Sequence, residues 1–195
     1  MIVDIVIVIA AALFIGVYVS WRAGRIDRLH VRVDMARAAL DVTLLRRSSV
    51  ALELATSGIL DPATSLLLAA AVHGTRPPVS GGGLGGVVPP EVQRPHDLAE
   101  SDLTRALRAA FSQPDFRASL SGKEGADELL AEVEAAAHQV FLARKFYNDM
   151  VAATRDARKR PLARVLRLSG RAKAPEFFEM DDSLVAEVSG ASLSL

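Results

Sequence analysis

The sequence predicts an all-α protein with an N-terminal transmembrane helix followed by an elongated antiparallel helical bundle. Residues 2–21 form one apolar run with a single charged residue. Downstream, apolar residues recur at spacings of three and four, which is the period of a helix face. Half of the residues are hydrophobic but only 5% are aromatic, so the core must be built from Ala, Leu and Val. No segment requires a strand.

Residues 1–22 are predicted to be a membrane anchor. The run IVDIVIVIAAALFIGVYVSW has about twenty residues, enough for a hydrocarbon core of about 30 Å, and Asp4 is its only charge. A cleaved signal peptide is the competing interpretation, but the start lacks basic residues and the exit lacks a small-x-small cleavage site. A buried core helix is disfavoured because the run is apolar on every face.

Basic residues predict the orientation of this anchor. No Lys or Arg precedes the run, and five arginines follow it: Arg22, Arg25, Arg28, Arg32 and Arg37. Basic residues favour the cytoplasmic side of a span. We therefore expect a single-pass protein of the cell membrane, with a short N-terminus outside, the bundle in the cytoplasm, and lipid contacts through residues 2–21.

Residues 25–73 are predicted to hold a first long helix, beginning after Gly24, and a short second one. The first carries an apolar stripe to about Thr56, and Gly58 then breaks the pattern. Asp61 followed by Pro62 is typical of a helix N-terminus. The stripe consists of Ile26, Leu29, Val33, Ala36, Leu40 and Leu44.

Residues 74–98 are predicted to be a flexible loop, because they contain six Gly and five Pro. The glycines at 81–86 formally fit a dinucleotide-binding pattern. That pattern needs a strand before it and a helix after it, and here prolines flank both sides. We therefore assign no nucleotide site to this segment.

Residues 99–180 are predicted to hold the remaining bundle helices and a closing segment, with 181–195 as a C-terminal tail. A third helix is expected from about Ala99 to before Pro114. A fourth is marked by apolar residues at alternating steps of four and three, typical of a coiled-coil seam. That seam is Leu129, Val133, Ala136, Val140, Ala143, Tyr147 and Met150.

The stretch RKFYNDMV, residues 144–151, places three polar side chains in this fourth helix. Tyr147 lies on the seam, and Asn148 and Asp149 lie beside it. The plain interpretation is that the Tyr ring packs inward while the other two are solvated or bond across helices.

Three other features accompany this stretch: the anchor, the patterns Arg32-Val33-Asp34, Asp41-Val42 and Arg46-Arg47 in the first long helix, and the closing sequence Pro175-Glu176-Phe177-Phe178-Glu179. Taken together, they resemble the LemA family of bacterial membrane-anchored proteins. The resemblance implies one transmembrane helix, an N-terminus outside and an antiparallel bundle inside. It implies no activity, because the molecular function of that family is not established. The chain departs from the family pattern at residues 153–156, where a second Tyr-Asn pair is usual, and at Arg160, where an aromatic residue is usual.

Two charge interactions are predicted. One hypothesis is that Arg46 or Arg47 reaches Asp149 across the bundle, where a partly buried pair would fix register more than add stability. The alternative is that these charges are solvated. Residues 155–173 contain eight basic residues and one acidic residue. Such a segment can bind anionic lipid or a partner protein. Because the fourth helix is expected to end far from the membrane, a partner protein is favoured over the bilayer, with a solvated helix end as the alternative.

No catalytic, cofactor or metal site is predicted. There is no Cys, the four His are scattered without an HExxH pair, and GxSxG and Walker patterns are missing. The net charge is zero, so nucleic acid is not an expected partner.

These observations predict a noncatalytic scaffold or docking bundle at the inner face of the membrane, with an unidentified protein partner. The alternative is an accessory or regulatory subunit of a membrane enzyme or protease. Self-association is left open, because a coiled-coil seam can pair helices between chains as well as within one. The candidate contact residues are Tyr147, Asn148, Asp149, Arg46, Arg47, Arg158, Lys159, Arg160, Phe177, Phe178 and Glu179.

Overall fold

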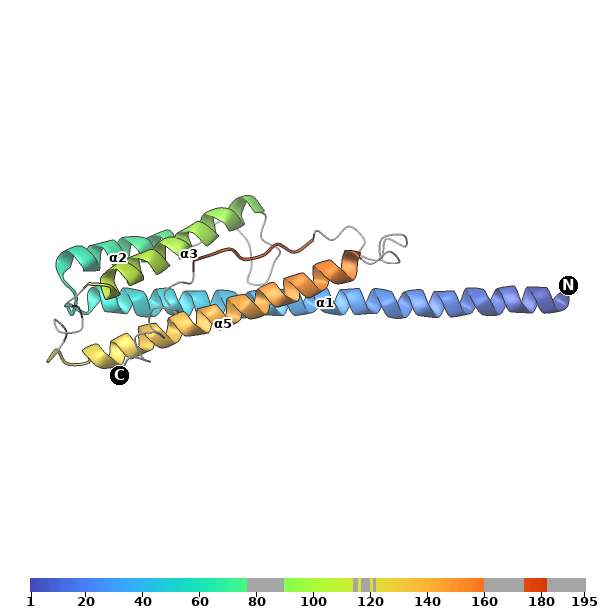
Figure 1. Cartoon of the computed structure of the whole chain (residues 1–195), viewed down its shortest axis with the longest axis horizontal. Coiled ribbons are helices and arrows are strands. Elements are labelled where there is room, and N and C mark those ends of the chain that lie inside the picture. Colours follow the sequence, from blue (N-terminus) through green and yellow to red (C-terminus); the bar gives the residue numbers. More distant parts are fainter. Residues whose placement is uncertain (77–89, 114–115, 117–119, 121, 160–173, 182–195) are drawn as a thin grey trace.

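The described part of the protein is helical, which confirms the all-α prediction (Figure 1). The computed structural model describes residues 1–76, 90–113, 116, 120, 122–159 and 174–181. Within them lie α1 (Ile2–Thr56), α2 (Pro62–Gly74), α3 (Pro90–Phe111) and α5 (Ala126–Lys159), and no strand is found in these residues. Most of the predicted tail, 181–195, lies outside the described residues.

Helix α1 is one continuous helix of 55 residues, about 80 Å long. The first long helix therefore does not begin after Gly24 but is continuous with the apolar run. A single glycine weakens a helix by only about 1 kcal/mol, which the rest of the hydrogen-bonded ladder outweighs. The N-terminal part of α1 projects alone beyond the other helices (Figure 1). Among the described residues, no helix is both long and apolar enough to cross a membrane.

The turn between α1 and α2 follows the sequence prediction. Gly58 adopts a left-handed backbone with φ of 74°. The Asp61 carboxylate then accepts hydrogen bonds from the backbone N–H groups of Ala63 and Thr64 at 3.0 and 3.1 Å. With Pro62 at the first helical position, this cap begins α2.

Helix α3 begins at Pro90, not near Ala99, so the assignment of residues 90–98 to a loop is wrong. Proline is tolerated in the first turn of a helix, because the N–H it lacks would have no partner there. Pro95 lies further inside. Burial of Leu103, Ala106, Leu107 and Ala110 provides apolar packing that offsets its cost. The glycine-rich segment 81–86, which is predicted to be part of a flexible loop, lies outside the described residues.

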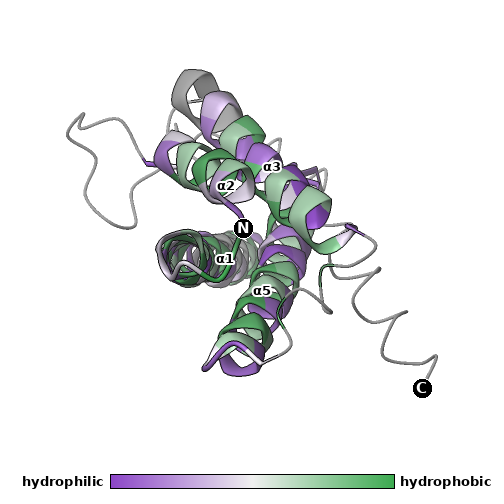
Figure 2. Ribbon diagram, turned by 90° about the vertical axis from the view of Figure 1, so that its left-hand side faces the viewer, coloured by the Kyte–Doolittle hydropathy of each residue, from purple (hydrophilic) through white to green (hydrophobic). Residues whose placement is uncertain are grey.

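Helix α5 runs antiparallel to α1, since Arg46 pairs with Glu132 near one end and Arg158 meets His30 near the other. The predicted seam is confirmed: Val133, Ala136, Val140 and Tyr147 are buried, and the other seam residues are partly buried. Helices α2, α3 and α5 group around one side of α1 (Figure 2).

Two clusters of buried apolar residues form the core. One, at the end of the bundle far from the N-terminus, joins all four helices through residues such as Leu54, Leu68, Leu107 and Val133. The other joins the middle of α1 to α5 and to Phe178 and Met180. The chain after α5 is therefore part of the core.

Candidate functional site

Tyr147 and Asn148 hold residues 174–181, an extended segment named here the closing strap. The Tyr147 hydroxyl donates to the carbonyl of Glu176 at 2.8 Å. The Asn148 amide nitrogen donates to the carbonyl of Phe178 at 3.2 Å, and its oxygen accepts from the N–H of Phe178 at 2.9 Å. These contacts explain why a packing helix carries a Tyr-Asn pair: it supplies backbone partners to a segment that has no secondary structure of its own.

The side chains of the strap continue this attachment. Phe178 is fully buried, with the Arg37 guanidinium 4.9 Å from its ring centroid and the His96 ring edge-on at 6.2 Å. Phe177 lies beneath Arg155 at 4.7 Å, and Arg155 Nε also donates to the carbonyl of Pro175 at 2.8 Å. The strap thus packs through one aromatic ring inside and another at the surface.

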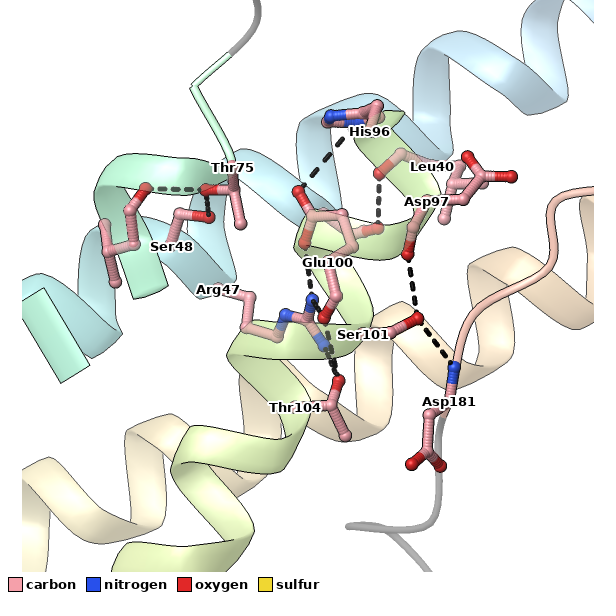
Figure 3. Close-up of polar contacts among 12 residues, drawn as sticks. Leu40, Arg47, Ser48, Thr75, His96, Asp97, Glu100, Ser101, Thr104 and Asp181 are labelled. Atoms are coloured by element: carbon pink, nitrogen blue, oxygen red, sulfur yellow. Dashed lines mark hydrogen bonds and ion pairs between the residues drawn. The ribbon is translucent and has the colours of Figure 1, made fainter. Parts of the chain in front are cut away.

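The strap also reaches α3. The N–H of Glu179 donates to Asp97 Oδ2 at 3.3 Å, and the N–H of Asp181 donates to Ser101 Oγ at 3.1 Å. Ser101 in turn donates to the carbonyl of Asp97 at 2.8 Å (Figure 3). The strap therefore connects α5 to α3 by hydrogen bonds to both.

On the same helix α3, Glu100 forms a buried ion pair with Arg47 of α1, and the two side chains are only 2% and 3% exposed (Figure 3). Arg47 also donates to Thr104 Oγ1 at 2.9 Å and to the carbonyl of Glu100 at 3.1 Å. Burial lowers the pKa of Arg47 and raises that of Glu100, and their attraction opposes both shifts. Because desolvation offsets much of the attraction, we interpret this pair as fixing how α3 sits on α1.

A second charged group, Arg37, Asp41 and Asp97, lies next to this pair. Arg37 Nε lies 3.0 Å from Asp41 Oδ1. Within the described part of the chain, Arg37 Nη1 and Asp97 Oδ1 are buried without a hydrogen-bond partner. Burial raises the pKa of Asp97 to about 6, although the Glu179 N–H opposes the shift. Burial also raises the pKa of Asp41 and, with the nearby Arg37, lowers that of His96.

The predicted contact between Arg46 or Arg47 and Asp149 is wrong. Arg46 lies 3.6 Å from Glu132, Arg47 pairs with Glu100, and Asp149 is exposed. The antiparallel register explains this. It places Glu132 opposite Arg46, so Asp149 lies about 25 Å further along α5.

The basic end of α5 lies near the projecting part of α1, so the expectation that the fourth helix ends far from the predicted anchor is also wrong. Arg158 Nη1 lies 3.2 Å from His30 Nε2, and Lys159 lies 3.6 Å from Asp156. His30 is only about 12 Å along α1 from residue 22. Four helices of alternating direction bring the last one back to the start. Arg160 lies outside the described residues.

The buried charges were missed by the sequence analysis, although a signal for two of them was present. Arg37 and Arg47 interrupt the apolar stripe of α1, and a charge at a core position requires a buried partner. Asp97 could not be named as a partner, because residues 74–98 are predicted to be a loop. Glu100 lies within the predicted third helix, but the spacing of residues in one helix does not say which other helix it faces. Among the described residues, no group of three or more His, Asp or Glu side chains could hold a metal ion.

No protein-family model, curated protein or solved structure matches the chain. The resemblance to the LemA family therefore stands on the motifs quoted above.

Proposed function

We propose that the chain is a LemA-like single-pass membrane protein whose bundle is a noncatalytic scaffold or docking platform at the inner face of the cytoplasmic membrane. The observation that carries this proposal is the projecting part of α1. Its apolar side chains are more than half exposed: Val3, Ile5, Val6, Ile7, Val8, Ile9, Leu13, Phe14 and Val17. Apolar surface in water costs roughly 25 cal/mol per Å², so a nonaqueous environment for this segment is favoured.

The charges around the segment support the proposed orientation. Asp4 lies 2.8 Å from the N-terminal ammonium group, and the arginines follow only from position 22 onward. An excess of basic residues after the apolar run favours a cytoplasmic bundle. In this orientation the basic end of α5 faces the bilayer, so anionic lipid is now favoured over a distant protein for Arg158 and Lys159.

The structure narrows which residues are accessible to a docking partner. Tyr147 and Phe178 are buried and Asn148 is bonded to the strap, so their polar and aromatic groups serve the fold. Asp149 is exposed, and Phe146 beside it is 55% exposed. We place the docking surface on this outer face of α5.

Membrane insertion is tested by extraction. The full chain in bacterial membranes is expected to be released by detergent and not by alkaline carbonate. Val8→Arg combined with Phe14→Arg should move it to the soluble fraction. Leu66→Arg is the matched control, because Leu66 is 73% exposed on α2 and should not affect extraction. Recovery of the wild-type chain from the soluble fraction, trimmed ahead of Arg25, would contradict the proposal.

Docking is tested separately by crosslinking in intact cells from a photoreactive residue at position 149, with position 66 as the control. A specific adduct at 149 and none at 66 is the expected result. A stoichiometric membrane enzyme in that adduct would favour the accessory-subunit alternative. Background labelling at both positions would remove support for docking through α5.

A further inference from the structure

Helix α1 carries a second apolar stripe on its outer face. Val31, Met35, Val42, Leu45 and Leu52 are 51%, 59%, 62%, 56% and 38% exposed. With Ala38 and Ser49 between them, the steps along the chain alternate four and three throughout. This is a heptad pattern over three repeats.

This outer stripe lies opposite the face that α1 turns to the bundle. The inward face contains Val33, Ala36, Leu40 and Leu44, all buried. At about 100° per residue, the two stripes point in opposite directions. Figure 2 shows α2, α3 and α5 grouped around one side of α1. The exposure of the stripe residues shows that the described helices leave this outer stripe uncovered.

The spacing indicates what kind of surface could cover this stripe. A helix face that is exposed to water needs no apolar repeat of 3.5 residues. A helix face that packs against another helix in a coiled coil does need this repeat. The stripe is about 33 Å long, which matches one long helix and not a compact domain. A second copy of α1 would supply the same stripe.

Charges beside the stripe favour a parallel pair of such helices. Met35 and Val42 take the first core position of the heptad, and Val31, Leu45 and Leu52 take the second. In a parallel pair, each residue just before a first core position faces the residue five positions later on the partner. Asp27 then faces Arg32. Asp41 and Arg46 have the same spacing, but they already pair within the chain, with Arg37 and Glu132. In an antiparallel pair centred on this region, the exposed acidic residues Asp27 and Asp34 would face each other, which is repulsive.

The proposed membrane anchor gives the same direction, and this step rests on the proposed function. Two chains inserted from one side of a bilayer have parallel α1 helices. The outer stripe also continues in phase into the apolar segment through Phe14, Val17 and Trp21, which are 75%, 70% and 59% exposed. Gly24 and Arg28 are its only interruptions between positions 14 and 31.

We propose that the outer face of α1, from Val31 to Leu52, binds the same face of a second copy of this chain, in parallel and in register. Three heptads are short for a coiled coil in water. Anchoring in one bilayer raises the effective concentration of the two helices, which supports their pairing.

The absence of Cys from the chain allows a direct test. Met35→Cys and, in a separate preparation, Leu66→Cys are placed in the full chain in bacterial membranes and treated with a mild oxidant. Met35→Cys is expected to form a disulfide dimer, whereas Leu66→Cys, which is exposed on α2, is expected to stay monomeric. Equal dimer yields at both positions would show random collision and overturn the proposal.

Orientation is read from a mixture of Met35→Cys and Leu52→Cys chains. A parallel, in-register pair crosslinks each position only with itself, so no mixed dimer is expected. A dominant mixed dimer would show antiparallel pairing and overturn the proposal.

The contribution of the stripe is tested by adding Val42→Glu and Leu45→Glu to the Met35→Cys chain. The dimer yield should fall by about tenfold, a loss of about 1.4 kcal/mol, while Leu66→Glu and Leu67→Glu leave it unchanged. Because positions 42 and 45 are exposed, the helical circular dichroism and melting temperature should be preserved. An undiminished dimer in the folded double variant would overturn the proposal.

The two proposals fail in different ways. If Met35→Cys gives no dimer while the chain still needs detergent for extraction, the dimer is refuted and the anchor stands. If the chain is soluble without detergent, the anchor is refuted, and the same crosslinks still decide whether the outer face of α1 pairs.

Discussion

At the scale of single residues, adjacent side chains in α5 have opposite roles. Asn148 bonds both backbone groups of Phe178, 30 residues away, whereas Asp149 is exposed. A helix turns about 100° between neighbours, so one residue of a polar triplet can face the core while the next faces solvent. The polar triplet is therefore mainly an attachment for the closing strap.

Asn148→Ala should destabilise the strap more than the rest of the bundle. Two hydrogen bonds are lost and the buried backbone of Phe178 is left unpaired, a cost of about 1–3 kcal/mol. Amide hydrogen exchange of residues 175–181 should accelerate. Asp149→Ala is the matched control and should change stability by less than about 0.5 kcal/mol. Equal protection of the strap in both variants would show that Asn148 does not hold it.

Asp97 predicts a pH dependence of stability. Its folded pKa of about 6 lies above the ordinary value of 3.8, so the folded state binds the proton more tightly than the unfolded state. The stability linked to Asp97 is then fully present below about pH 4 and is lost as pH rises through about 6, by up to about 3 kcal/mol.

Asp97→Asn should therefore be more stable than the wild type at pH 7.5, by about 1–3 kcal/mol, and close to it at pH 4. Urea unfolding in detergent at both pH values measures this. The pKa values of His96, Asp41 and Glu100 are also shifted. Their contributions to the free energy of unfolding largely cancel when the variant is compared with the wild type at the same pH. A variant less stable than the wild type at pH 7.5 would contradict this account.

At the scale of elements, backbone conformation and packing decide where helices begin and end. Gly58 lies two residues after the end of α1 and has a positive φ, whereas Gly24 lies within α1. The sequence predicts a helix boundary near each residue, and only Gly58 lies at one. Proline likewise fails to exclude residues 90–98 from α3, because one face of that helix is buried.

The two glycines predict opposite effects of substitution by alanine. A Cβ at either position would meet no atom within 4 Å, so only the backbone matters. Gly58→Ala should lower the free energy of unfolding by about 1–2 kcal/mol, the cost of a left-handed backbone. Gly24→Ala should leave it unchanged or raise it by up to about 1 kcal/mol. Melting temperatures in detergent compare them, and a loss at Gly24 would argue against a continuous α1.

At the scale of the whole molecule, the return of α5 toward the N-terminal part of α1 sets which end of the bundle faces the proposed membrane. The contact of Arg158 with His30 places the end of α5 near the apolar segment. The start of α5 lies at the far end of the bundle, with Glu132 beside Arg46.

Single labels on α5 should report this arrangement. A fluorophore on Lys159→Cys should be quenched by a quencher attached to lipid head groups, because α5 ends near the proposed anchor. The same fluorophore on Glu132→Cys, about 40 Å further along the helix, should not be. Equal quenching at both positions would mean that the bundle lies along the bilayer.

The sequence by itself determined the features that depend on local geometry. The periodicity of apolar residues predicted α1 and α5 and the face each buries, and Gly58 with Asp61-Pro62 predicted the turn and the start of α2. Such signals depend on residues within a turn or two of each other. The spacing of apolar residues in the sequence also contains the outer stripe of α1, but only the structure shows that no described helix covers it.

The tertiary structure decided which buried polar groups meet. Arg47 with Glu100, Asn148 with Phe178, and Arg158 with His30 join residues 53, 30 and 128 positions apart. The periodicity of apolar residues predicts that a helix face is buried. It does not identify the element that covers this face, because apolar contacts are not directional. A buried charge or amide needs one specific partner in one geometry, and only the packing of the whole chain supplies it.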